Sequence, residues 1–236
     1  MDLLISVTTE DEVAAALQGG ADIIDVKNPA EGALGGSFPW VLRAVRAATP
    51  AGVPVSAALG DAPNLPGTMA LAALGAAACG PQYVKLGLMG PRQVADALHL
   101  LRAVCRTVAE FSSRTAVIAA AYADAERVGA FPPLELPAVA AAAGARGCLL
   151  DTALKTGDNL FAHLDDGQLA RFVADCRRRG LLSALAGSLT AADIPRIQAI
   201  GPDIIGFRTA ACRGDRVHGR IDACAVRHLQ SLLGPR

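Results

Sequence analysis

Short apolar segments recur along the chain at a steady interval, separated by stretches with helical periodicity. The apolar segments cover residues 3–7, 22–27, 53–59, 83–87, 115–122, 147–151, 181–187 and 203–208. Most are continuously apolar rather than alternating, which is typical of parallel strands that are buried on both faces. The pattern therefore predicts eight buried strands.

The stretches between these segments predict helices. Amphipathic patterns cover residues 8–20, 38–50, 91–111, 166–180 and 188–201. In the first of them, Thr9 and Glu12 have the spacing of a capping box. In the last, Pro195 indicates either a kink or a later helix start.

Eight strand–helix alternations with right-handed crossovers predict a closed (β/α)8 barrel of the α/β class. The length of the chain fits one such domain over residues 1–236. An open, doubly wound sheet is the alternative. It has less support, because no GxGxxG motif follows the first strand.

Charged residues lie at the ends of the second, fourth, sixth and eighth predicted strands. They are Asp25, Lys27, Lys85, Asp151 and Arg208, and Lys155 follows in the loop or first helical turn after the sixth strand. Side chains of one barrel layer come from alternate strands, and barrel active sites lie at the carboxyl ends of the strands. Because Asp25 and Lys27 are two residues apart, they project from the same strand face. We therefore expect these side chains to converge on one pocket.

Each of these residues also has a purely structural interpretation. Lys27 and Asp25 fit an ion pair at a strand end, Lys85 fits a loop that reaches solvent, and Asp151 fits a helix cap. Taken singly, these interpretations are favoured. Four strand ends in phase favour a functional site instead.

The residue types indicate the chemistry. A lysine in a crowded, cationic and partly desolvated site loses its proton more easily, and the free amine can form a Schiff base with a carbonyl. A nearby carboxylate can transfer protons, and a second lysine or an arginine can hold a phosphate. The combination predicts carbon–carbon bond chemistry on a phosphorylated aldehyde or ketone.

Two loops are candidates for the phosphate site. Barrels often bind phosphate through the loops after strands 7 and 8. The candidate residues there are Gly187, Ser188, Arg208, Thr209 and Ala210. The alternative for the Gly-Ser pair is an ordinary helix cap.

Composition narrows the choice of partners. The chain has 22 basic and 22 acidic residues, so it lacks the electrostatic footprint of a nucleic-acid-binding protein. Its six cysteines form no CxxC or zinc pattern and indicate a reducing cytoplasm. No metal, nucleotide or cofactor motif is present, and the apolar stretches are too short to cross a membrane. Alanine-rich helices would allow a homo-oligomer, but the sequence does not define one.

Four long segments resemble the (5-formylfuran-3-yl)methyl phosphate synthase family. They are GGADIIDVKNPAEGALGGSFPWV, PGTMALAALGAAACGPQYVKLGL, DTALKTGDNLF and DIIGFRTAACRGDRVHGRI. The resemblance runs nearly end to end, although few residues match around YADAERVGAFPPLELP. It implies a TIM barrel that makes the furan precursor of methanofuran from two molecules of glyceraldehyde 3-phosphate.

The resemblance also implies roles for individual residues. The Schiff-base lysine falls on Lys27 and the neighbouring carboxylate on Asp25. The other catalytic or binding positions fall on Lys85, Asp151 and Lys155. In the implied mechanism, Lys27 binds one triose phosphate, a carboxylate transfers protons, and addition to the second triose phosphate precedes loss of phosphate, dehydration and ring closure.

Two other functions remain compatible with the residues alone. One is a different class I aldolase or a sugar-phosphate isomerase, because fold and Schiff-base lysine do not name a substrate. The other is a sugar-phosphate sensor or an inactive scaffold. That reading would gain support if Lys27 or Asp25 were replaced, and both are present.

Overall fold

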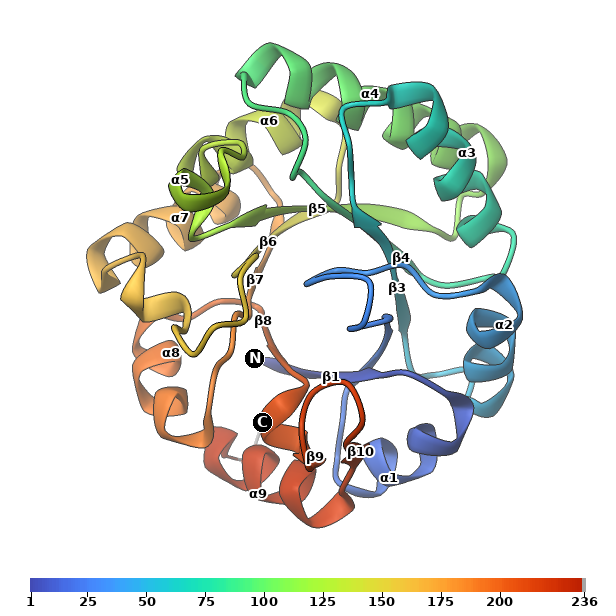
Figure 1. Cartoon of the computed structure of the whole chain (residues 1–236), viewed down its shortest axis with the longest axis vertical. Helices are drawn as coiled ribbons and strands as arrows, with labels where there is room; N and C mark the ends of the chain where they lie inside the picture. Colours follow the sequence, from blue (N-terminus) through green and yellow to red (C-terminus); the bar gives the residue numbers. More distant parts are fainter. Residues whose placement is uncertain (235–236) are drawn as a thin grey trace.

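The computed structural model describes residues 1–234, and all eight predicted strands form in it. The strands are β1 Asp2–Val7, β2 Ile23–Val26, β3 Val55–Asp61, β4 Tyr83–Gly87, β5 Ala116–Tyr122, β6 Gly147–Asp151, β7 Leu182–Leu185 and β8 Ile204–Phe207. Each pairs in parallel with its neighbours in the chain, and β8 returns to β1 (Figure 1). The predicted closed (β/α)8 barrel is therefore confirmed.

Helices form a ring around the barrel (Figure 1). The α-helices are α1 Val13–Gln18, α2 Pro39–Ala48, α3 Pro66–Ala77, α4 Val94–Phe111, α5 Ala125–Val128, α6 Leu136–Ala143, α7 Asp166–Arg178, α8 Ile194–Ile200 and α9 Ala223–Leu233. Short 3-10 helices are η1 Glu10–Glu12, η2 Pro133–Glu135, η3 Leu160–Ala162, η4 Ala191–Asp193 and η5 Thr209–Ala211. None of the helices in residues 1–234 is long and apolar enough to cross a membrane.

Two apolar layers explain why the strands read as continuous hydrophobic runs. In β2, Ile24 and Val26 pack outward in the main core, whereas Ile23 belongs to a smaller cluster inside the barrel. Asp25 lies on the same strand face as Ile23 and lines the cavity at the barrel mouth, and Lys85 of β4 lines it too. The two-residue period of a strand therefore places the charged residues in the barrel interior.

The start of the first helical segment differs from the expectation. Thr9 makes no capping bond through its side chain. Instead, the backbone N–H and the hydroxyl of Thr8 donate to Glu12 at 2.7 and 3.1 Å. The predicted capping box was wrong because Glu12 is held by a buried ion pair with Arg208. The later helix start at Pro195 is confirmed, since that proline lies in the first turn of α8.

A two-stranded hairpin follows the barrel. Its strands, β9 Cys212–Arg213 and β10 Arg220–Ile221, pair antiparallel between β8 and α9. The sequence pattern did not predict this hairpin. It lies beside the barrel opening (Figure 1) and contributes one residue, Arg216, to the cavity lining.

Candidate active site

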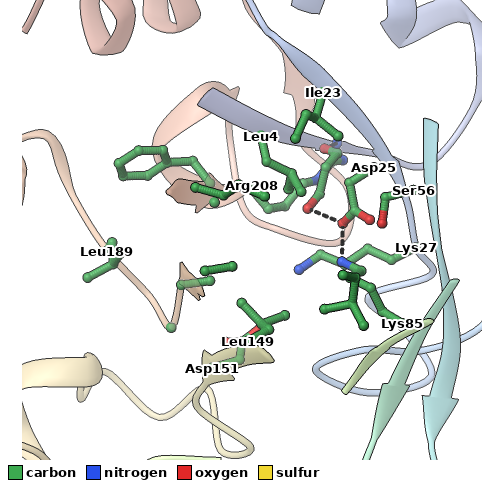
Figure 2. A pocket seen from close by; sticks show the side chains of 18 of the residues that line it. Leu4, Ile23, Asp25, Lys27, Ser56, Lys85, Leu149, Asp151, Leu189 and Arg208 are labelled. Carbon is green, nitrogen blue, oxygen red and sulfur yellow. Dashed lines mark hydrogen bonds and ion pairs between the residues drawn. The ribbon is translucent and has the colours of Figure 1, made fainter. Parts of the chain in front are cut away.

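One cavity at the barrel mouth brings together the five expected site residues. Asp25, Lys27, Lys85, Asp151 and Lys155 all line it. The chain contains only three lysines, and all three are in this cavity. Figure 2 shows the side chains from β2 and β4 pointing toward one another. The predicted convergence of the even strand ends is confirmed as geometry.

Asp25 and Lys85 form a buried ion pair across β2 and β4. The Lys85 Nζ lies 2.7 Å from Asp25 Oδ2, and the same oxygen accepts a hydrogen bond from the Ser6 hydroxyl at 2.9 Å (Figure 2). Asp25 is fully buried and Lys85 is 4 % exposed. The ion pair of Asp25 is therefore with Lys85, not with Lys27, and Lys85 does not extend to solvent.

A second pair, Asp151 and Lys155, lies at the end of β6. The Lys155 Nζ is 2.7 Å from Asp151 Oδ1 and also donates to the Thr152 hydroxyl at 3.0 Å. Burial of Asp151 raises its pKa, but the charges of Lys155 and Lys27 and the hydrogen bonds from Lys155 and Thr152 outweigh this, so the pKa falls to about 2. Asp151 is therefore a carboxylate at any working pH.

Lys27 has no such partner. Its Nζ has one hydrogen-bond acceptor, the carbonyl oxygen of Ala33, at 3.5 Å, and no carboxylate of residues 1–234 lies within ion-pair distance. Burial lowers its pKa to about 8, and the charges of Lys85 and Lys155 act in the same direction against those of Asp151 and Asp25. A lysine with this pKa supplies free amine near neutral pH.

Two carboxylates outside the predicted set fix the loops that surround these lysines. Asp61, at the end of β3, accepts hydrogen bonds from the N–H groups of Ala33 and Leu34 at 2.9 and 3.1 Å and from the Tyr122 hydroxyl. Gly32 must lack a side chain there, since a Cβ would lie 2.1 Å from Asp61 Oδ2.

Asp124, after β5, performs the same task for the loop after β6. It accepts from the N–H groups of Ala153 and Leu154 at 2.7 and 2.8 Å, immediately before Lys155. Tyr122 and Asp124 lie at the start of the segment YADAERVGAFPPLELP. The segment therefore positions two loops: the loop after β2, whose Ala33 carbonyl oxygen contacts Lys27, and the loop after β6, which carries Lys155.

The loop after β7 has the features of an anion site. Gly187 and Ser188 both have positive φ, at 106° and 53°, and Ser188 is the one non-glycine residue of residues 1–234 in that region. Their backbone N–H groups have no hydrogen-bond partner within the described chain. Both residues line the cavity, as does Thr209 of η5, whereas Ala210 does not. A strained backbone with free N–H groups is a common arrangement at ligand sites.

Arg208 makes most of its hydrogen bonds to other residues of the protein. It is 5 % exposed, forms an ion pair with Glu12 at 2.7 Å, and donates to the carbonyl oxygens of Ser6, Arg216 and Gly219. Its hydrogen bonds hold the β9–β10 hairpin against the barrel. Four bonds leave one of its five N–H groups for a ligand.

Arg216 is a cavity residue that sequence reasoning missed. It is half-buried, lines the cavity, and donates to the carbonyl oxygen of Gly32 at 3.1 Å. Burial lowers its pKa from the ordinary value, while the charges of Asp151 and Asp61 oppose that change. Its position follows from the unpredicted hairpin, so no strand-phase argument could have found it.

A closed (β/α)8 barrel whose mouth holds two buried lysines, a third that is partly buried and two carboxylates defines the class, a barrel enzyme with lysine chemistry available to it. Comparison with known proteins gives the family. The 4-HFC-P synthase model matches residues 3–230. The (5-formylfuran-3-yl)methyl phosphate synthase of Methanothermobacter thermautotrophicus is 50% identical over 99% of both chains. The chain belongs to this family of enzymes, as the resemblance implied.

Another relative agrees with this assignment, and a solved structure shares the fold. The synthase of the same name from Methanococcus maripaludis is 49% identical over 97% of this chain and 98% of its own. Phosphoribosyl anthranilate isomerase from Thermus thermophilus superposes with a TM-score of 0.63 at 20% identity, covering 99% of this chain and 98% of its own. At that identity the second likeness supports the barrel fold alone.

Proposed function

We propose that this chain condenses two molecules of glyceraldehyde 3-phosphate to (5-formylfuran-3-yl)methyl phosphate through a Schiff base on Lys27, as a step toward methanofuran. The name of its relatives supports the overall reaction. The observation that carries the Schiff base is the state of Lys27. Of the three lysines it alone lacks a carboxylate partner within the described chain, and its pKa is lowered to about 8.

The covalent steps balance without an oxidant or reductant. The Lys27 amine attacks the aldehyde carbon, a carbon–nitrogen double bond forms, and the carbonyl oxygen leaves as water. Loss of a proton from the adjacent carbon gives an enamine-type nucleophile, through which the carbon–carbon bond to the second triose phosphate forms. Elimination of one phosphate, dehydration, ring closure and release of the amine give the furan. Over the cycle, two triose phosphates lose one phosphate and two waters.

The two ion pairs supply the proton transfers in this proposal. Asp25 and Asp151 are each paired with a lysine, so each can accept a proton that its lysine then shares. Asp151 also stabilises the positive charge of a protonated Schiff base, since its charge is the largest one that favours the protonated Lys27. Lys85 and Lys155 orient the aldehyde oxygens or phosphates.

The phosphates bind at the edge of the mouth in this proposal. The free N–H groups of Gly187 and Ser188, with that of Thr209 at the start of η5, hold one phosphate. Arg216 and the remaining N–H group of Arg208 contribute positive charge. Within residues 1–234, the Arg216 side chain makes a single hydrogen bond to the protein, so its planar fork is available for bidentate contact with phosphate.

Borohydride trapping tests this function directly. The protein is incubated with glyceraldehyde 3-phosphate and reduced, and peptide mass spectrometry locates the adduct, which is simple with three lysines in the chain. We expect the adduct on Lys27, and, without reduction, an ultraviolet-absorbing furan aldehyde with one phosphate released per product. An adduct on another lysine would refute the assignment, and an adduct without furan would indicate a different aldolase.

Lys27→Arg provides the matched variant. It keeps the positive charge and most of the side-chain volume, but its guanidinium has no nucleophilic amine at working pH. We expect no trapped adduct and no furan from this variant. Turnover in Lys27→Arg would place the nucleophile on Lys155 or Lys85.

A further inference from the structure

Two buried polar atoms inside the barrel have no hydrogen-bond partner within residues 1–234, and they lie on neighbouring strands. They are Oδ1 of Asp25 and the hydroxyl of Ser56. Asp25 on β2 is in register with Ser56 on β3, and both side chains line the cavity (Figure 2). Asp25 is fully buried and Ser56 is 1 % exposed.

The hydrogen bonds of the other buried serines show that the lack of a partner is particular to Ser56 and Asp25 Oδ1. On the other side of Asp25, the in-register Ser6 donates its hydroxyl to Oδ2, which Lys85 also contacts. Ser183, an equally buried serine on β7 outside the cavity lining, has its hydroxyl bonded to Asp203 at 2.7 Å. Serines in this barrel are therefore satisfied by the protein, with Ser56 the exception among the three buried ones.

An unsatisfied buried hydroxyl and an unsatisfied carboxylate oxygen both reduce the stability of the folded protein. A free lone pair beside a free hydroxyl is complementary to a group that both donates and accepts a hydrogen bond, and an alcohol is such a group. An alcohol can donate its proton to the Asp25 oxygen and accept the proton of Ser56. A phosphate does not fit, because its oxygens would meet the carboxylate with like charge.

We propose that Asp25 Oδ1 and the Ser56 hydroxyl form a subsite for the hydroxyl group next to the substrate's carbonyl carbon. Lys27 lies two residues beyond Asp25 on the same strand face, so a substrate joined to Lys27 has its next carbon within reach of this subsite. The subsite deepens the proposed function and rests on it: it selects 2-hydroxy aldehyde phosphates over the same chain without the hydroxyl.

Ser56→Ala is the variant that tests the subsite. Calorimetric titration with glycerol 3-phosphate, which has the hydroxyl and no carbonyl, should show about 3- to 10-fold weaker binding than in the unchanged protein, the effect of one neutral hydrogen bond. Titration with 3-hydroxypropyl phosphate, which lacks that hydroxyl, should show no difference between the two proteins. Because neither ligand reacts, this result is independent of furan formation.

Unfolding measurements separate this role from a structural one. Ser56→Ala removes an unsatisfied group, so its midpoint of thermal unfolding should equal or exceed that of the unchanged protein. Ser183→Ala is the matched control: it loses the hydrogen bond to Asp203, should unfold at a lower temperature, and should bind glycerol 3-phosphate normally.

Borohydride trapping supplies the reactive counterpart. With glyceraldehyde 3-phosphate, Ser56→Ala should form the Lys27 adduct about 3- to 10-fold less efficiently, and with 3-oxopropyl phosphate as efficiently as the unchanged protein. Equal loss with both ligands of either pair, or unchanged affinity for glycerol 3-phosphate, would overturn the subsite. Lower stability of Ser56→Ala would show that the hydroxyl serves the fold. Failure of the unchanged protein to form furan, with the calorimetric difference present, would count against the proposed function alone.

Discussion

Lys27 should titrate near pH 8, and its midpoint should move in opposite directions when two of its neighbours are changed. Burial is the largest cause of its lowered pKa, from 10.5 to about 8. A shift of that size corresponds to about 3 kcal/mol in favour of the free amine. At pH 7 about a tenth of the molecules then carry the amine, compared with fewer than about one in a thousand for an ordinary lysine.

The neighbours give the test its sign. Lys85→Met removes a charge that lowers the pKa of Lys27 and also frees Asp25 from its ion pair, so both effects raise that pKa. Asp151→Asn removes the largest charge that raises it and leaves Lys155 uncompensated, so both effects lower it. One charge is removed in each case, yet the expected shifts are opposite.

Nuclear magnetic resonance can measure the three midpoints without turnover. Because the chain has three lysines, labelling with lysine that carries ¹³C at Cε gives three side-chain signals, which single lysine-to-arginine variants assign. The Cε signal of Lys27 should change near pH 8 in the unchanged protein. A midpoint near 10.5, or shifts of the same sign in both variants, would refute the electrostatic account of its reactivity.

Three further predictions concern the residues around the mouth. Arg216→Ala should raise the KM for glyceraldehyde 3-phosphate by about tenfold or more, whereas the exposed Arg220→Ala in the same hairpin should leave it unchanged; equal KM values would remove Arg216 from the phosphate site. Tyr122→Phe removes a hydroxyl that anchors the loop after β2, so hydrogen exchange at residues 32–34 should accelerate and stability should fall by about 1–2 kcal/mol; unchanged exchange would contradict this role. Glu12→Gln breaks a buried ion pair and should cost about 3 kcal/mol in denaturant unfolding at pH 7. Burial raises the pKa of Glu12, but its hydrogen bonds and ion pair with Arg208 lower it overall, so this stabilisation should fade below about pH 4.5; a loss that persists in acid would contradict it.

The barrel and the main site residues were predictable because both depend on strand order and strand ends. Buried parallel strands give continuous apolar runs, and a lysine or aspartate at the end of such a run lies at the mouth of the barrel. That logic found Asp25, Lys27, Lys85 and Asp151. It could not determine their pairing, because the partner of Asp25 depends on the register across β3, which alternating polarity does not encode.

The residues that were missed share a different cause. Ser56, Asp61 and Tyr122 lie on odd strands, where the pattern showed mainly small apolar residues. The register between β3 and β4 shifts between Ala58 and Asp61 on β3. Gly87 on β4 leaves room for the Tyr122 hydroxyl, because a Cβ at this position would lie 2.1 Å from the hydroxyl oxygen. The irregularity of β3 and the missing side chain of Gly87 on β4 therefore determine where these residues lie. Neither feature produces a periodic pattern in the sequence.

The lowered pKa of Lys27 also connects reactivity with stability. Its pKa in the folded state is below that of the unfolded chain, so the unfolded state binds more protons between about pH 8 and 10.5. The contribution of Lys27 to the free energy of unfolding is therefore unfavourable below pH 8, by about 3 kcal/mol, and this cost disappears as the pH rises to 10.5. Replacing the amine by the apolar Lys27→Met should relieve that cost at pH 7 and flatten the pH dependence of unfolding across the same range. If the free energy of unfolding of the unchanged protein did not vary with pH across this range, Lys27 would be an ordinary ammonium group. Another residue would then have to be the nucleophile.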